Sequence, residues 1–285
     1  MYTRILVATG GSPWSDAAVT SAIALAARTG ADLHVLTVLT MPSTYAVPDM
    51  MGGSDIVMEG IEAEGQALMA QTAARAASVE VPCETVCAWG NVPETILRTA
   101  ADECCDLIVL GSRGLGGLKR LMLGSVANAV AAKAAQPVLI VKQPAVYSMP
   151  FGRRVLVATG GSPWSDAAVE HAIQLAQSQQ LSICVLHVTR GQPQRGSEVT
   201  LEGKELLARA EARMAAAAVA YEGVQAYGDV VQAILETATR KRCDSIIMGS
   251  RGLTGWKRLM LGSISNAVTA KTRLPVLIVK RFFQG

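Results

Sequence analysis

Two glycine-rich segments of the chain have the residue types and the spacing of a loop that holds phosphate groups. Residues 111–114 read Gly-Ser-Arg-Gly, and Gly124-Ser125 follows after nine further residues. Glycine lets main-chain N–H groups approach an anion closely, and the free N–H groups and the dipole at the start of a helix favour phosphate. Ser125 adds a hydroxyl donor, and Arg113 adds positive charge. The spacing therefore predicts an anion site where a strand passes into a helix.

The same loop occurs twice because the chain contains a duplicated domain. Chance does not produce two long matches in the same order. A turn without a ligand is an alternative for one loop alone, but duplicated surface loops usually diverge, and the retention of both favours a ligand. The matching stretches are 6–19 with 156–169, which are identical, and 111–142 with 249–280, which differ at eight positions and include the second loop, 249–252 followed by Gly262-Ser263.

Each copy reads as alternating strands and helices around an aliphatic core. Half of the residues are hydrophobic and only 4% are aromatic, which is typical of buried parallel strands covered by helices. The alternation predicts the fold class α/β, with two tandem doubly wound domains, 1–145 and 151–285, each with a five-stranded parallel sheet flanked by helices. Ligands of such sheets bind beyond the carboxyl ends of the strands. In the first copy we expect strands at 5–9, 33–39, 81–88, 107–110 and 137–141, and helices at 12–30, 61–77, 92–101 and 127–135.

Composition excludes several classes of function. A formal charge of +3 over 285 residues is too small to indicate the basic surface that nucleic-acid binding requires. No segment approaches the roughly 20 apolar residues of a membrane helix, and the N-terminus lacks a signal-peptide layout, so we expect a soluble, cytoplasmic protein without a membrane partner. The six cysteines and three histidines show no zinc-ligand spacing. We therefore interpret His34, His171 and His187 as structural or surface residues and predict no metal site.

The glycine loop matches neither common nucleotide motif. No lysine follows its second glycine as Walker A requires, and the G-x-G-x-x-G fingerprint with a later acidic residue is absent, which argues against a nicotinamide cofactor. No nucleophile–base pair or metal set for phosphoryl transfer is evident, so no catalytic residue is predicted. We predict a nucleotide-binding regulatory module with slow hydrolysis at most. The alternatives are a Mg²⁺-dependent ATPase or nucleotidyl-transfer enzyme, and a scaffold whose loops are empty or hold only anions.

These residues resemble the universal stress proteins of the UspA superfamily. The pattern G-x2-G-x9-G-[ST], the signature of the ATP-binding branch of that family, is complete in both copies, and the similarity includes residues 5–8, 33–36 and 137–141. The resemblance implies a tandem stress-response protein with an adenine nucleotide alpha-hydrolase-like fold. It also implies ATP or another adenine nucleotide as the bound molecule, with Mg²⁺ as a companion ion.

The resemblance carries the nucleotide contacts of the family onto matching positions in both copies. Loop residues would hold the ribose and phosphates, the backbone at the end of the second strand would face adenine, and the segment after the first strand would line the ribose. The implied binding residues are Thr9, Gly10, Val38, Gly111, Arg113, Gly114, Gly124, Ser125 and Val126 in the first copy, and Thr159, Gly160, Val188, Gly249, Arg251, Gly252, Gly262, Ser263 and Ile264 in the second.

One position departs from the family pattern in both copies. The family usually places an aspartate after the first strand, near the ribose, where this chain has Gly10 and Gly160. Loss of that carboxylate removes a charge-assisted hydrogen bond of roughly 1.5–3 kcal/mol. We expect reduced affinity for ATP or a preference for another adenine nucleotide.

The last strand of each copy is predicted to join the two domains. Residues 138–141 and 276–279 are wholly apolar although they stand at a sheet edge, and such edges need cover. In the family, this strand pairs across a two-fold axis with its counterpart. The resemblance thus implies that the two domains form an internal pseudo-dimer, and the apolar composition is also compatible with a homodimer of whole chains.

Overall fold

In the residues that the structure describes, the protein has two similar halves, each with five strands and four helices in strict alternation. The computed structural model describes residues 2–41, 54–113, 123–142, 150–191, 198–251 and 261–280; the predicted loop residues Gly114 and Gly252 lie outside them. The first half contains β1 (Arg4–Ala8), α1 (Pro13–Thr29), β2 (Asp32–Leu39), α2 (Ser54–Ala77), β3 (Cys83–Trp89), α3 (Val92–Asp102), β4 (Leu107–Gly111), α4 (Ser125–Lys133) and β5 (Val138–Val141). The second half contains β6 (Arg154–Thr159), α5 (Pro163–Gln179), β7 (Ser182–Thr189), α6 (Glu198–Ala216), β8 (Tyr221–Tyr227), α7 (Val230–Arg240), β9 (Ser245–Gly249), α8 (Ser263–Lys271) and β10 (Val276–Val279).

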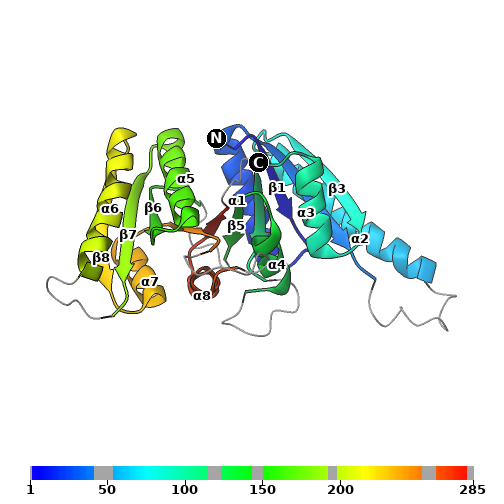
Figure 1. Cartoon of the computed structure of the whole chain (residues 1–285). Coiled ribbons are helices and arrows are strands. Elements are labelled where there is room, and N and C mark those ends of the chain that lie inside the picture. Colours follow the sequence, from blue (N-terminus) through cyan, green and yellow to red (C-terminus); the bar gives the residue numbers. More distant parts are fainter. Residues whose placement is uncertain are drawn as a thin grey trace.

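All ten strands belong to one continuous sheet (Figure 1). Its order is β3-β2-β1-β4-β5-β10-β9-β6-β7-β8, so each half contributes the parallel, doubly wound set that the sequence predicts. The halves meet where β5 and β10 pair antiparallel, with Leu139 opposite Leu277. This confirms the predicted α/β class and the expected pairing of the last strands. The apolar edges predicted for each domain are therefore buried in the middle of the sheet.

The helices cover both faces of the sheet and bury an aliphatic core on each. On one face α1 packs through residues such as Leu25, and α2 packs through Met69. On the other face α3 contributes Ile96 and α4 contributes Val130. Each of the two core clusters contains residues of both halves, so the cores run across the junction between them. The halves therefore form one packed body.

Local sequence signals fix the start and the end of α1. The Ser12 side chain accepts a hydrogen bond from the Ser15 amide at 3.2 Å, and Pro13 occupies the first turn. The helix ends at Gly30, which adopts a left-handed φ of 69°. Ser162 caps α5 in the same way, accepting from the Ser165 amide at 3.1 Å. The identical sequences thus produce identical caps at the edge of the sheet where the glycine loops lie.

Two equivalent lysines bind the halves together beside the sheet junction. The Lys142 ammonium donates to the carbonyl of Thr269 near the end of α8, and the Lys280 ammonium donates to the carbonyl of Ala131 in α4. Cations are favoured there because carbonyl groups at the end of a helix lack intrahelical partners. Each lysine therefore stabilises the helix of the other half.

A buried histidine joins the N-terminus to the second half and predicts loss of stability in acid. Tyr2 Oη and His171 Nε2 are 2.7 Å apart, and burial lowers the pKa of His171 to about 4, with Asp106 acting weakly in the opposite direction. The unfolded chain takes up this proton near the ordinary value of 6.5. Protonation therefore favours unfolding as the pH falls from 6.5 to about 4, by at most about 1.4 kcal/mol per pH unit, and leaves stability unchanged above 6.5.

The H171Q variant checks this prediction. Glutamine keeps a hydrogen-bonding partner for Tyr2 and removes the titration. Urea unfolding at several pH values between 4 and 7.5 is expected to show a shallower acid loss in the variant than in the unmodified protein. Parallel curves would assign the acid sensitivity to carboxylates instead.

Candidate functional site

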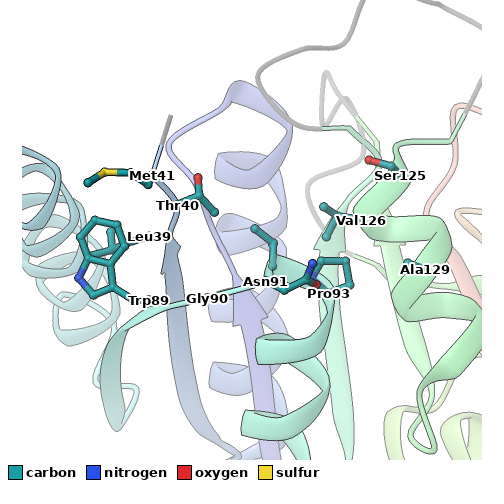
Figure 2. A pocket seen from close by; sticks show the side chains of 11 residues that line it. Leu39, Thr40, Met41, Trp89, Gly90, Asn91, Pro93, Ser125, Val126 and Ala129 are labelled. Carbon is teal, nitrogen blue, oxygen red and sulfur yellow. The ribbon is translucent and has the colours of Figure 1, made fainter. Parts of the chain in front are cut away.

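A cleft opens at the carboxyl ends of the strands in the first half. It has a volume of about 650 Å³, within the usual range for ligand pockets of about 300–1,000 Å³. Figure 2 shows the end of β2 with Trp89 on one side and the start of α4 on the other. Of the predicted binding residues, Ser125 and Val126 line it. The remaining wall is formed by Leu39, Thr40, Met41, Trp89, Gly90, Asn91, Val92, Pro93 and Ala129.

The corner between β1 and β4 brings together Gly10, Gly111 and Gly124 from the predicted residues of the first half. A Cβ atom added to Gly111 would lie 2.6 Å from the carbonyl carbon and oxygen of Trp14 and 2.9 Å from the Ser15 amide. Ser15 Oγ in turn accepts from the Gly10 amide at 3.4 Å. Beyond the strand, the Gly124 amide donates to the carbonyl of Ser112 at 2.9 Å. These contacts connect the end of β1, the start of α1, the end of β4 and the start of α4.

The helix that starts at the glycine loop has no side-chain cap in either half. Gly124 and Gly262 are the N-cap residues of α4 and α8, and because glycine has no side chain, neither residue caps the first turn of its helix. By contrast, Asn91 caps α3, accepting from the Glu94 amide at 3.3 Å. The N-cap residues of α4 and α8 therefore leave the first amides of these helices available to water or another acceptor. This is the arrangement in which helices bind anions.

Arginine and lysine give this corner a positive charge. The Arg113 guanidinium lies over the ring of Trp14, 5.8 Å from its centroid, and Arg251 lies over Trp164 at 5.6 Å. Burial, reinforced by Arg113, lowers the pKa of Lys142 to about 8. Burial and Arg251 lower the pKa of Lys280 to the same value. Each arginine therefore places a second positive charge near a buried lysine.

At the end of the second strand of each half, one face carries an apolar side chain and the other face carries a side chain that hydrogen-bonds to the first strand. Val38 and Val188 pack their side chains toward the α3 and α7 face, one residue before the end of the strand. On the opposite face, Thr37 Oγ1 donates to the Thr9 carbonyl at 2.9 Å, and His187 Nδ1 donates to the equivalent carbonyl of Thr159 at 3.1 Å. His187 is therefore held by the main chain, as the structural interpretation of this residue expects.

Sequence reasoning missed the part of the cleft formed by β3 and α3. Trp89 lines it while its Nε1 donates to Glu62 at 2.8 Å, and Asn91 and Pro93 lie at its floor (Figure 2). The sequence did contain a signal for this wall. Asn91 before Val92-Pro93 has the pattern of a helix N-cap, and Asp229 before Val230 has the same pattern in the second half. Such helix starts belong to the same sheet edge as the glycine loops.

The sequence of each half matches one protein family. The model of the universal stress protein family matches residues 1–142 and again residues 152–280. The chain belongs to the universal stress protein family. It is the tandem form, in which two family domains share a single sheet.

Similar universal stress proteins occur in bacteria and archaea. A universal stress protein of Mycobacterium tuberculosis is 27% identical over 97% of both chains, and YxiE of Bacillus subtilis is 34% identical over 45% of this chain and 98% of its own length. The crystal structure of a universal stress protein from Archaeoglobus fulgidus matches with a TM-score of 0.75, at 25% identity over 98% of both chains. Another universal stress protein, solved in complex with cAMP, is 28% identical over 49% of this chain and 97% of its own, with a TM-score of 0.39.

The glycines in place of the usual universal stress protein aspartate lie in open space. A Cβ atom at Gly10 or Gly160 would have no heavy atom within 4 Å, and neither glycine has a left-handed φ. Both residues are exposed. Neither packing nor backbone conformation therefore requires glycine here. No helix in the described part of the chain combines the length and the apolar character needed to cross a membrane.

Proposed function

We propose that the protein is a stress-response or regulatory module that binds an adenine nucleotide in each half. The observation that carries this proposal is the start of α4 beside the cleft, where Gly124 is the N-cap residue and supplies no capping side chain. The same arrangement recurs at Gly262 in α8. A helix kept open in this way in both halves is suited to a phosphate group.

The residues at the corner fit a nucleotide by their chemistry. Main-chain amides of Ser125 and Val126 would donate hydrogen bonds to phosphate oxygens, and the Ser125 hydroxyl would add another donor. Arg113 would add charge from the adjacent loop, and the apolar wall at Leu39 and Trp89 would take the base. Ser263, Ile264 and Arg251 are the matching residues of the second half. Hydrogen-bond donors next to an apolar wall are suited to a ligand that has both a phosphate group and a base.

A charge change at the start of both helices tests the proposal. In the S125D/S263D variant, the new carboxylates favour the helix dipole, so the fold is retained, but they repel a phosphate and compete for its amides. We expect affinity for ATP, ADP, AMP or cAMP to fall by roughly 10–150-fold, which corresponds to about 1.5–3 kcal/mol. Equilibrium binding of labelled nucleotides measures the change, and cAMP is included as the ligand of a solved universal stress protein.

The matched control is S125A/S263A, which removes only the hydroxyl groups. It is expected to lose much less affinity than the aspartate variant, because the amides remain. Mass spectrometry of the ligand released from freshly purified protein should detect two equivalents of an adenine nucleotide. Equal binding by all three proteins, or no binding by any, would contradict the proposal. Mg²⁺-dependent turnover of about 1 s⁻¹ or faster would favour an enzyme.

A further inference from the structure

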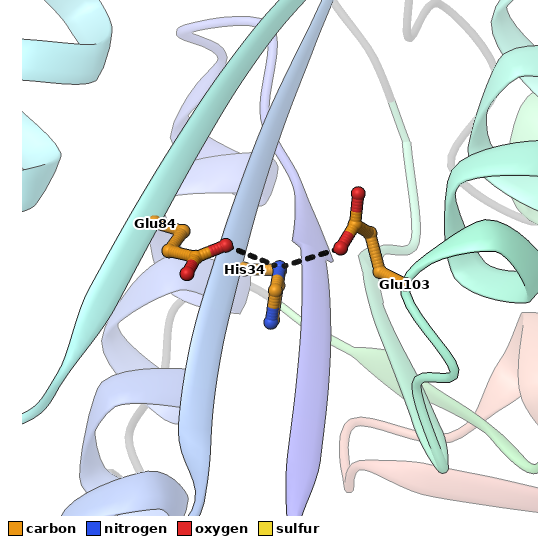
Figure 3. A group of neighbouring side chains, drawn as sticks. All are labelled: His34, Glu84 and Glu103. Carbon is orange, nitrogen blue, oxygen red and sulfur yellow. Dashed lines mark ion pairs between the residues drawn. The ribbon is translucent and has the colours of Figure 1, made fainter.

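Three side chains from separate elements converge at the amino ends of the strands in the first half. His34 lies near the start of β2, Glu84 lies opposite it in β3, and Glu103 is the residue that ends α3. Figure 3 shows both carboxylates directed at the imidazole. His34 Nδ1 is 3.5 Å from Glu84 Oε2 and 4.0 Å from Glu103 Oε2, and all three atoms lie within 4.8 Å of one another. This cluster is at the opposite end of the strands from the cleft.

The imidazole at the centre of this cluster is buried, and its Nδ1 atom lacks a hydrogen bond. The His34 side chain is 5% exposed, and its Nδ1 atom makes no hydrogen bond. A buried polar atom without a partner is costly, so such an atom calls for an explanation. The carboxylates are more exposed, and the side chains of Glu84 and Glu103 are 76% and 41% exposed. A species that bridges the three groups would satisfy the nitrogen and both oxygens.

In the second half, the carboxylate at the equivalent position is neutralised by cationic side chains of the protein itself. Cys184 replaces the histidine and lies opposite Glu222, and Lys241 replaces Glu103 as the residue that ends α7. The Lys241 ammonium bonds to Glu222, and Arg154 bonds to the same carboxylate at 3.0 Å.

In the first half the corresponding cations do not fill this role. The equivalent arginine, Arg4, donates to the main-chain carbonyl of Glu103 at 2.7 Å, as Arg154 also does to that of Lys241 at 3.3 Å, but among the described residues Arg4 forms no ion pair with Glu84. Among the residues that the structure describes, the ion pairs of Glu84 and Glu103 are those with His34. Glutamate in place of lysine lowers the local charge by two, which is the charge of a divalent cation.

We propose that His34, Glu84 and Glu103 bind a divalent transition-metal ion of the zinc class. One imidazole nitrogen and two carboxylate oxygens suit zinc, cobalt or a similar ion, with water at the remaining positions. Ligands at about 2.0–2.1 Å from a tetrahedral ion lie roughly 3.4 Å apart, close to the spacing of His34 and Glu84. The spacings that involve Glu103, which are 4.0 Å to His34 and within 4.8 Å to Glu84, are longer than this, and the Glu103 carboxylate, which is 41% exposed, would move toward the other two ligands when the ion binds. The ion ties the edge strand β3 to β2 and to the end of α3.

Calorimetric titration of untagged, metal-stripped and nucleotide-free full-length protein with zinc chloride tests the site. We expect one equivalent to bind at this cluster and to raise the melting temperature. E103K should weaken this binding by at least about a hundredfold, because it replaces a ligand by a cation. The second half folds with lysine at the matching position, so E103K is expected to remain folded, as circular dichroism would verify. H34Q should give a similar loss.

Two controls separate this site from other groups that bind metal. E222Q changes the matching carboxylate of the second half and should leave the zinc affinity unchanged. Cobalt bound to nitrogen and oxygen ligands should give only weak visible bands, whereas a strong near-ultraviolet charge-transfer band would identify cysteine ligands. The proposal is overturned by that band, by binding that survives E103K, or by the absence of stoichiometric binding.

Discussion

Replacing Gly111 by alanine is expected to destabilise the protein by about 3 kcal/mol or more. The new Cβ atom would lie 2.6 Å from the carbonyl carbon and oxygen of Trp14, and 2.9 Å from the Ser15 amide. All three are main-chain atoms of α1, so no side-chain rotation can relieve the overlap. Either the end of β4 or the start of α1 must move, and both form the corner of the candidate site. Denaturant unfolding, followed by circular dichroism, measures the loss.

The matched control is G10A, because Gly10 follows β1 in the same corner of the site. Its Cβ atom has no neighbour within 4 Å, and we expect a change within about 0.5 kcal/mol. G249A should reproduce the large effect, because Gly249 meets Trp164 and Ser165 at the same distances as Gly111 meets Trp14 and Ser15. If G111A proved as stable as G10A, the glycine would be required by a ligand and not by packing.

The fold was predictable because its signals are local and repeated. Short aliphatic runs mark the buried strands, and Ser12, Pro13 and Gly30 mark both ends of α1. The prediction was least accurate for α2, which begins at Ser54 and not near residue 61. Ile56 in this extension is 74% exposed, so the segment buries no apolar face that periodicity could reveal. The pairing of β5 with β10 was predicted from the family resemblance and from the apolar sequences of these last strands.

The candidate site was only partly predictable. Spacing identified the loop, but it assigned Gly111 to an anion, whereas the structure shows a further reason for glycine in its contact with Trp14. The His34 cluster was missed because it depends on the register of β2 with β3, which pairs His34 with Glu84, and on the place where α3 ends. Sequence separation conceals such groups, since no linear motif joins a strand residue to a helix terminus.

The second large effect is a gain of affinity when the aspartate of the family is restored. G10D/G160D places a carboxylate after the first strand of each half, where the resemblance locates the ribose. Ribose hydroxyl groups would donate to it, and a hydrogen bond to a charged acceptor contributes about 1.5–3 kcal/mol, or roughly 10–150-fold in affinity for ATP. Neither position meets a neighbour within 4 Å, so the substitution should leave stability unchanged. Equilibrium titration with labelled ATP measures the gain.

A change of ligand distinguishes this explanation from a general effect of charge. With 2′,3′-dideoxy-ATP the gain should disappear, because the donating hydroxyl groups are absent, and G10N/G160N should give a smaller gain with ATP, because the acceptor is neutral. If the aspartates weakened binding of both nucleotides, the phosphates would lie nearer to Gly10 and Gly160 than the ribose does. In that case the glycines would serve to keep negative charge away from this corner, beside the Arg113 and Arg251 cations that the two halves retain.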